Sequence, residues 1–167
     1  IDSIGNLSDE TNYKYKRVVE DFYTKKDLYN ITEYYKNGIL KSKGISLNKF
    51  FTNYIGKYNS YYESGNKYNL LILSETGKST KEIIWYENGE KKLERENTYD
   101  SINNKYNNRV IQFWNKDGVQ KIIAGNGEYE EDNEYYSKKG TYLNGFKNGI
   151  WIGTDKKTNF SYTENYL

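Results

Sequence analysis

A pattern of two aromatic residues, one variable residue, a small polar residue and a glycine recurs along the chain. Four copies lie at residues 34–38, 61–65, 85–89 and 113–118, the last with one extra residue. Their glycines are 27, 24 and 29 positions apart, by subtraction of the residue numbers. A repeat of this length predicts an array of small units, in which each unit buries its apolar side only against its neighbours.

Each copy of the pattern predicts a β-hairpin. Asn37-Gly38, Asn88-Gly89 and Asp117-Gly118 are dipeptides that tolerate the positive φ of type I′ and related tight turns. Aromatic and β-branched residues, which favour strands, flank these turns. Because one hairpin cannot bury its apolar face alone, neighbouring hairpins should extend one sheet. The predicted fold is all-β, an elongated antiparallel meander of repeated hairpins in a single sheet.

This interpretation divides the chain into a flexible leader over residues 1–12 and a single repeat domain over 13–167. The predicted units lie near residues 31–45, 55–73, 79–98, 108–129 and 135–166. The glycines predicted to have turn or other structural roles are Gly38, Gly65, Gly89, Gly118, Gly145 and Gly149. Residues 13–23 are predicted as a strand, residues 97–108 as a polar loop and residues 128–134 as an acidic surface segment.

Composition excludes several kinds of function. Lys and Arg number 25 and Asp and Glu number 23, a net charge of +2, whereas nucleic-acid binders normally show a basic excess. Without cysteine there is no disulfide, thiol nucleophile or thiolate metal site. Without histidine there is no imidazole base or ligand. The 20 tyrosines and 3 tryptophans instead supply the large apolar area that folding requires.

The remaining routes to catalysis or ligand binding have weak support in the sequence. Glu63 and Glu87 occupy the same place in two repeats and could form a carboxylate pair, but a charge before a turn ordinarily serves solubility. The glycines of residues 125–127 match neither phosphate-binding fingerprint. The acids of residues 128–134 lack a calcium-loop pattern, and strand alternation would divide them between two faces. We therefore expect no enzymatic activity, no cofactor and no metal.

Residues 140–151 read GTYLNGFKNGIW. This segment resembles the MORN-repeat unit Gly-x-Tyr-x-x-Gly-x-x-x-Gly-x-Trp, which begins at Gly140 and ends at Trp151. Residues 34–41 resemble the bacterial MORN variant of YwqK-type antitoxin-like proteins. Residues 113–121, followed by 125–127, are similar to envelope proteins of that group, some of which carry a TonB-like domain. The resemblance covers residues 13–166.

The resemblance implies an interaction or scaffolding module without catalytic residues, and the antitoxin designation implies neutralisation of a partner toxin by binding. We expect the partner to be a protein, such as a toxin or an envelope protein, held by exposed aromatic rings. The candidate rings are those of Tyr35, Tyr62, Trp85, Tyr86, Trp114, Tyr142 and Trp151. Adjacent rings of a strand point to opposite faces, so one ring of each pair can be core while the other is exposed.

Two alternatives stay open: the same rings and asparagines could bind a cell-surface or cell-wall glycan, or the chain could be a spacer that binds nothing. A start at Ile1 fits export to the periplasm, the cell surface or the medium, with the cytoplasm as the alternative. The longest apolar run is about four residues, so no transmembrane segment is expected. The sequence leaves the oligomeric state open.

Overall fold

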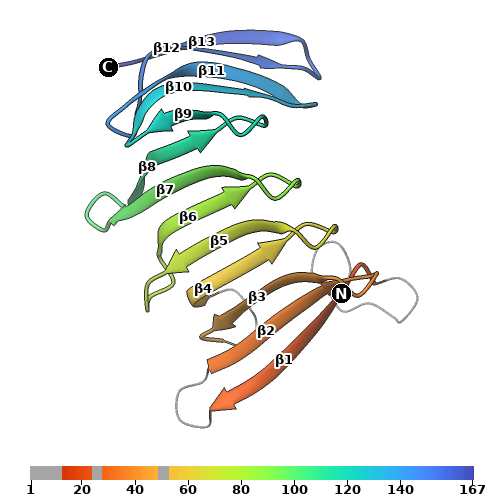
Figure 1. The fold of residues 1–167 in the computed structure, drawn as a ribbon. Helices are drawn as coiled ribbons and strands as arrows, with labels where there is room; N and C mark the ends of the chain where they lie inside the picture. The colour runs from red at the N-terminus through yellow and green to blue at the C-terminus, as the bar shows by residue number, and fades with distance from the viewer. Residues whose placement is uncertain (1–12, 24–27, 49–52) are drawn as a thin grey trace. The chain divides into compact units, whose positions relative to one another are not determined.

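The computed structural model describes residues 13–23, 28–48 and 53–167, which form β-strands and turns and no helix (Figure 1). The strands are β1 (Tyr15–Tyr23), β2 (Leu28–Tyr35), β3 (Leu40–Ser46), β4 (Tyr54–Tyr61), β5 (Lys67–Leu73), β6 (Ser79–Trp85), β7 (Lys91–Asp100), β8 (Lys105–Trp114), β9 (Gln120–Ile123), β10 (Asn126–Asp132), β11 (Tyr136–Leu143), β12 (Phe146–Asp155) and β13 (Phe160–Tyr166). The predicted leader, residues 1–12, lies outside the described residues.

The chain divides into two compact units, the first ending at Gly89 and the second beginning at Glu90. In the first unit, β1 to β6 pair antiparallel in chain order. In the second unit, β7 to β13 do the same. This confirms the prediction of an all-β antiparallel meander of hairpins. The boundary between the units falls inside the predicted repeat at residues 79–98.

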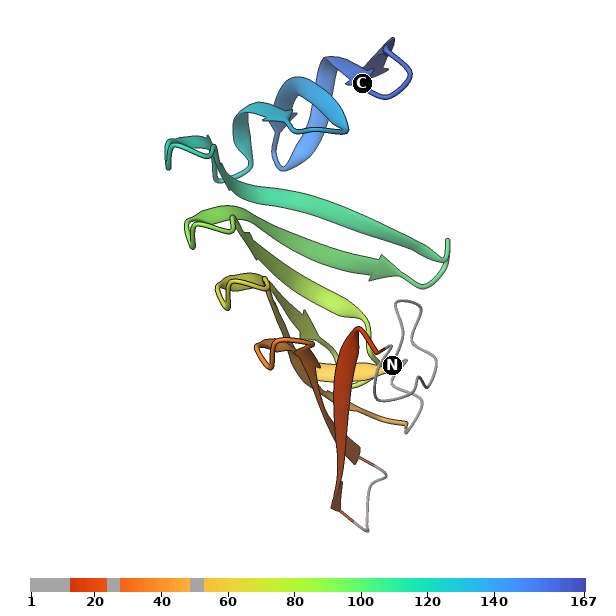
Figure 2. The same ribbon diagram turned by 90° about the vertical axis from the view of Figure 1, so that its right-hand side faces the viewer.

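Five tight turns share one hydrogen bond, in which a glycine N–H donates to the carbonyl three residues earlier. The pairs are Gly38 to Tyr35, Gly65 to Tyr62, Gly77 to Ser74, Gly89 to Tyr86 and Gly118 to Asn115, at 2.9–3.1 Å. Each glycine has φ between +75° and +90°, whereas the preceding residue does not have positive φ. These are therefore type I turns closed by a left-handed glycine, one of the related turns and not type I′ itself. The turn between β2 and β3, the turn between β4 and β5 and the turn that follows β6 lie above one another along one edge of the first unit (Figures 1 and 2).

Type I′ geometry occurs instead in the second unit, where two consecutive residues have positive φ. Ala124 and Gly125 join β9 to β10, and Asn144 and Gly145 join β11 to β12. Gly145 is therefore a turn residue, as its sequence predicted. Gly149 also has positive φ, at +65°, but it lies within β12.

A bulge in β11 and β12 explains the glycines of the 140–151 segment. Lys139 pairs with Ile152 and Thr141 with Asn148, so two steps on β11 oppose four on β12. Gly149 sits in this bulge and directs Trp151 onto the backbone of Gly140. An ideal Cβ at Gly140 would lie 2.5 Å from Cγ of the Trp151 ring, so only glycine fits there.

The first unit contains the same bulge between β3 and β4, which the sequence pattern did not reveal. Lys43 pairs with Asn59 and Ile45 with Ile55, again two steps against four. Gly56 has φ +65° and precedes Tyr58 by two residues, as Gly149 precedes Trp151. The rings of Tyr54 and Tyr58 cover Gly44, where an added Cβ would lie 2.9 Å from both rings. Both units thus use a ring over a strand glycine.

The predicted polar loop at residues 97–108 is wrong. Strand β7 continues to Asp100 and β8 begins at Lys105, which leaves a turn of four residues. The rings of Tyr99 and Tyr106 face each other across the two strands, with centroids 5.0 Å apart. This cross-strand contact and the backbone ladder stabilise the strand ends at 97–100 and 105–108, whose other side chains are polar.

Candidate functional site

The seven predicted binding rings do not form an exposed stripe. Trp151 is buried, with 2% of its surface exposed, and the other six are half-buried. Trp151 is therefore a core side chain, which corrects its prediction as a contact residue. Its burial depends on Gly140, which leaves space for the ring, and on the bulge at Gly149. The alternation of residues along one strand does not reveal this arrangement.

Two of the predicted rings connect successive hairpins of the first unit. The hydroxyl of Tyr35 donates to the carbonyl of Tyr61 at 2.6 Å. The hydroxyl of Tyr62 donates to the carbonyl of Trp85 at 2.8 Å. Burial is the main reason that the pKa of both phenols is raised. The second ring of these aromatic pairs therefore stabilises the stack of turns, and its polar group is already engaged.

Side-chain amides reinforce the same stack. Asn66 donates from Nδ2 to the carbonyl of Glu87 at 2.8 Å, and Asn37 donates to the carboxylate of Glu63 at 3.4 Å. Both glutamates, which the sequence offered as a carboxylate pair, are exposed on their turns. Asn37 also accepts from the N–H of Ile39, which closes its own turn. Asn37 and Asn66 thus have structural roles in the turns.

Lysine ammonium groups cover the tryptophan rings of two pairs. In the first unit, Nζ of Lys67 lies 5.4 Å from the ring centroid of Trp85. In the second unit, Nζ of Lys91 lies 5.1 Å from the ring centroid of Trp114. A cation over the face of a tryptophan is a favourable contact, and a sugar that stacked on the same face would have to displace the lysine.

The second unit contains a continuous row of aromatic rings that forms its core. Its members are Phe113, Tyr129, Tyr142, Trp151 and Tyr166, whose neighbouring ring centroids are 4.5–6.4 Å apart. The sequence patterns did not single out Tyr129 or Tyr166. In residues 128–132, Tyr129 alternates with acidic residues, and this pattern could have indicated that its ring lies on the buried face of a strand.

Lys147 closes one end of this aromatic row. Its Nζ lies 4.5 Å from the ring centroids of both Trp151 and Tyr166. It donates to the hydroxyl of Tyr166 at 2.8 Å and to the carboxylate of Glu164 at 3.3 Å. Burial lowers the pKa of Lys147, but these hydrogen bonds outweigh it and raise the pKa overall. The cation is therefore a fixed part of the fold.

Strand alternation divides the acids of β10 between two faces. Glu131 lies on the side of the aromatic row, where Tyr129 donates to it at 2.5 Å and Lys92 lies 2.5 Å away. Burial raises the pKa of Glu131, but these two partners outweigh it, so its pKa is below the usual value. Glu128, Glu130 and Asp132 are exposed. Within the described ranges, no group of three or more acidic side chains is placed to hold a metal ion.

A buried carboxylate also lies in the first unit. Glu33 is 6% exposed and accepts hydrogen bonds from Arg17, at 2.9 and 2.5 Å, and from Ser42, at 3.0 Å. The ammonium group of Lys41 lies 3.3 Å away. Burial raises the pKa of Glu33, but Arg17 and Lys41 outweigh burial and the pKa is lowered. With its charge matched, this carboxylate serves the fold.

The largest unexplained feature is an apolar face on β11 and β12. Leu143, Phe146, Ile150 and Ile152 are 51%, 49%, 64% and 43% exposed. Leu143 and Phe146 pair across the two strands. Ile150 and Ile152 flank Trp151 in β12 and therefore point to the face opposite the aromatic row. We call these four residues the apolar face.

Known proteins do not identify the chain: no family model matches it, and no curated protein matches it. In the residues that the structure describes, no helix is long and apolar enough to cross a membrane.

Proposed function

We propose that the protein is a non-enzymatic interaction module that holds a protein partner on the apolar face. The observation that carries this proposal is the exposure of four large apolar side chains on one hairpin of the second unit. Soluble proteins rarely expose such side chains together unless they contact another molecule. This role agrees with the one that the resemblance to MORN-variant proteins implies, with a toxin or an envelope protein as the class of partner.

The chemistry of the apolar face favours a protein over a sugar. Three of the four side chains are aliphatic, and all four lack the polar groups that hold a sugar, whereas the centres of protein interfaces are apolar. Glu130 and Lys139 pair across β10 and β11, and Lys139 pairs with Ile152, so opposite charges border the apolar face. Such border charges mainly set association rate and specificity.

A pair of matched double variants tests the proposal. Ile150→Thr/Ile152→Thr removes apolar surface from the apolar face but keeps β-branched residues in the strand. Ile102→Thr/Val119→Thr removes exposed apolar side chains from two turns of the same unit. Each chain is immobilised and exposed to native envelope extract, after circular dichroism has shown that it is folded.

We expect one polypeptide to be retained by the parent and by the Ile102→Thr/Val119→Thr variant. The Ile150→Thr/Ile152→Thr variant should not retain it. Photo-crosslinking from position 150 should then label the same polypeptide. Equal retention by both double variants would place the contact elsewhere. If the parent retains no polypeptide, the protein-binding proposal fails.

A further inference from the structure

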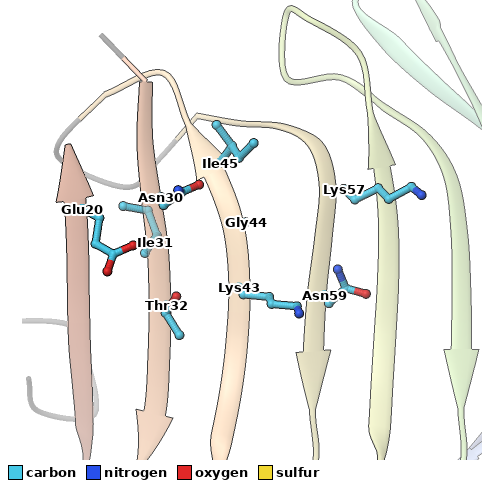
Figure 3. Close-up of a pocket in the computed structure, with 9 residues that line it drawn as sticks. All are labelled: Glu20, Asn30, Ile31, Thr32, Lys43, Gly44, Ile45, Lys57 and Asn59. Atoms are coloured by element: carbon cyan, nitrogen blue, oxygen red, sulfur yellow. The ribbon is translucent and has the colours of Figure 1, made fainter. Parts of the chain in front are cut away.

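The first unit carries an open groove across β1 to β4, with a volume of about 300 Å³ (Figure 3). Its polar lining includes two lysines, Lys43 and Lys57, and two asparagines, Asn30 and Asn59. Lys43 and Asn59 are a cross-strand pair of β3 and β4, and therefore lie side by side on one face of the sheet. The groove thus gathers cationic and amide groups from neighbouring strands.

In the part of the chain that the structure describes, the polar groups of this groove are not engaged by the rest of the fold. Within residues 13–23, 28–48 and 53–167, neither Lys43 nor Lys57 has a carboxylate partner, and the two asparagine side chains make no hydrogen bond. Four other lysines differ in this respect: the ammonium groups of Lys41, Lys91, Lys92 and Lys147 lie 2.5–3.3 Å from a carboxylate oxygen. The groove therefore presents donors and acceptors that the fold itself does not use.

A second hollow, of about 370 Å³, lies at the other end of β2, and its lining includes Tyr13, Lys16 and Tyr34. Lys16 pairs with Tyr34 across β1 and β2, so the two share a face. Asn30, at the first hollow, and Tyr34 are four residues apart on β2, which is about 13 Å along a strand on the same face. We call these two hollows, which lie along β2, the β2 track.

Charge and chemistry define what would fit the β2 track. Of the side chains that line the two hollows, all of which are described, Glu20 alone is acidic. Ammonium groups attract carboxylates, carboxamides exchange hydrogen bonds with hydroxyls, and tyrosine rings pack on the C–H faces of sugars. We propose that the β2 track binds an acidic polysaccharide, a sugar chain that carries carboxylate groups. This site lies in the first unit and does not depend on the apolar face of the second.

The probe is a galacturonic-acid hexamer, titrated into the full chain by isothermal calorimetry. Maltohexaose provides the same number of neutral sugars, and a uridine hexanucleotide provides the alternative anionic polymer. We expect the acidic hexamer to bind, the neutral hexamer to bind at least tenfold more weakly, and the affinity to fall as salt screens the charges.

Two matched variants locate the binding. Lys43→Gln/Lys57→Gln should weaken binding of the acidic hexamer by about tenfold, the scale expected for two exposed ion pairs. Lys116→Gln/Lys157→Gln removes the same net charge from exposed turns of the second unit and should leave the affinity unchanged. Tyr34→Leu should weaken binding without changing its salt dependence, because it removes a ring and no charge.

Three outcomes would overturn the proposal. The first is a folded chain, confirmed by circular dichroism, that binds no acidic hexamer. The second is an equal loss of affinity in the two lysine variants, which would mean attraction to net charge alone. The third is tighter binding of the uridine hexanucleotide, which would make the β2 track a site for single-stranded nucleic acid.

Discussion

One added methyl group at Gly140 should destabilise the second unit, because the ring of Trp151 occupies the space that a side chain needs. An ideal Cβ at Gly140 would lie 2.5 Å from Cγ of Trp151, whereas ordinary contacts are 3.4–4 Å. The ring or the strand would therefore have to move by about 1 Å. Trp151 is 2% exposed, and the ring centroids of Tyr129 and Tyr142 lie 5.6 and 5.2 Å from its own. Little room exists for that movement.

The expected magnitude follows from two opposing contributions. Overpacking of a filled core costs roughly 1–3 kcal/mol. Replacing glycine by alanine at a permissive backbone recovers about 0.4–1 kcal/mol through the unfolded chain. Gly140→Ala should therefore lower the free energy of unfolding of the second unit by about 1–2 kcal/mol. Gly44→Ala should cost less in the first unit, because its Cβ would lie 2.9 Å from two half-buried tyrosine rings that need to move less.

Equilibrium urea unfolding, followed by tryptophan fluorescence and circular dichroism, measures these differences. A double-mutant cycle with Trp151→Ala then tests the cause. Without the ring, Gly140→Ala should cost nothing or stabilise slightly, which gives a coupling of at least about 1 kcal/mol. If Gly140→Ala costs as much without the ring as with it, the steric explanation is wrong. A Gly140→Ala variant as stable as the parent would refute it equally.

Three further predictions follow from the hydrogen bonds and charges of the first unit. Tyr62→Phe removes the hydroxyl that donates to the carbonyl of Trp85 and should lower the free energy of unfolding in urea by about 1 kcal/mol. Tyr68→Phe, a control at a more exposed ring, should change stability little. Equal effects of the two variants would contradict a structural role for the Tyr62 hydroxyl. Because the pKa of Glu33 is lower in the folded state, the unfolded state binds more protons, and stability should fall as pH drops below about 4.5. Glu33→Gln should flatten this decline when urea midpoints are measured between about pH 7 and 3. An unchanged pH profile would contradict this role of Glu33. Burial raises the pKa of Tyr54 from 10.0 to about 12, so stability should fall between pH 10 and 12 as the unfolded state loses the proton first. Tyr54→Phe should remove part of that alkaline decline, and ultraviolet titration of tyrosinate should lose one component that ionises near pH 12. A parent and variant with identical titrations would exclude this assignment.

The turns were predictable because their chemistry is local. Glycine after an aromatic residue, a variable residue and an asparagine or serine permits the left-handed φ that closes the hairpin, whatever the rest of the chain does. Gly38, Gly65 and Gly89 accordingly have φ of +84°, +90° and +90°. Local patterns failed at residues 97–108, where polar composition suggested a loop. There the pairing of Tyr99 with Tyr106 depends on register between two strands, which composition does not express.

The candidate site was less predictable than the fold. The sequence pointed to aromatic rings, yet Tyr35 and Tyr62 join hairpins through their hydroxyls, and Trp151 is in the core. Among the described residues, those left available include the apolar side chains around Ile150, and Lys43 and Lys57 of the β2 track. Whether a side chain is available depends on whether residues of other strands contact it. Recurring motifs in the sequence do not contain that information.

The sequence by itself determined the all-β class, the hairpin spacing and the positions of the turn glycines, because turn geometry and strand alternation depend on neighbours along the chain. Only the tertiary structure decided which rings are buried and which side chains remain free. The bulges at Gly56 and Gly149 place Tyr58 and Trp151 over glycines of the preceding strands. The burial of each ring requires a glycine without a Cβ on one strand and the ring itself on another. This contact therefore forms only when the two strands are paired.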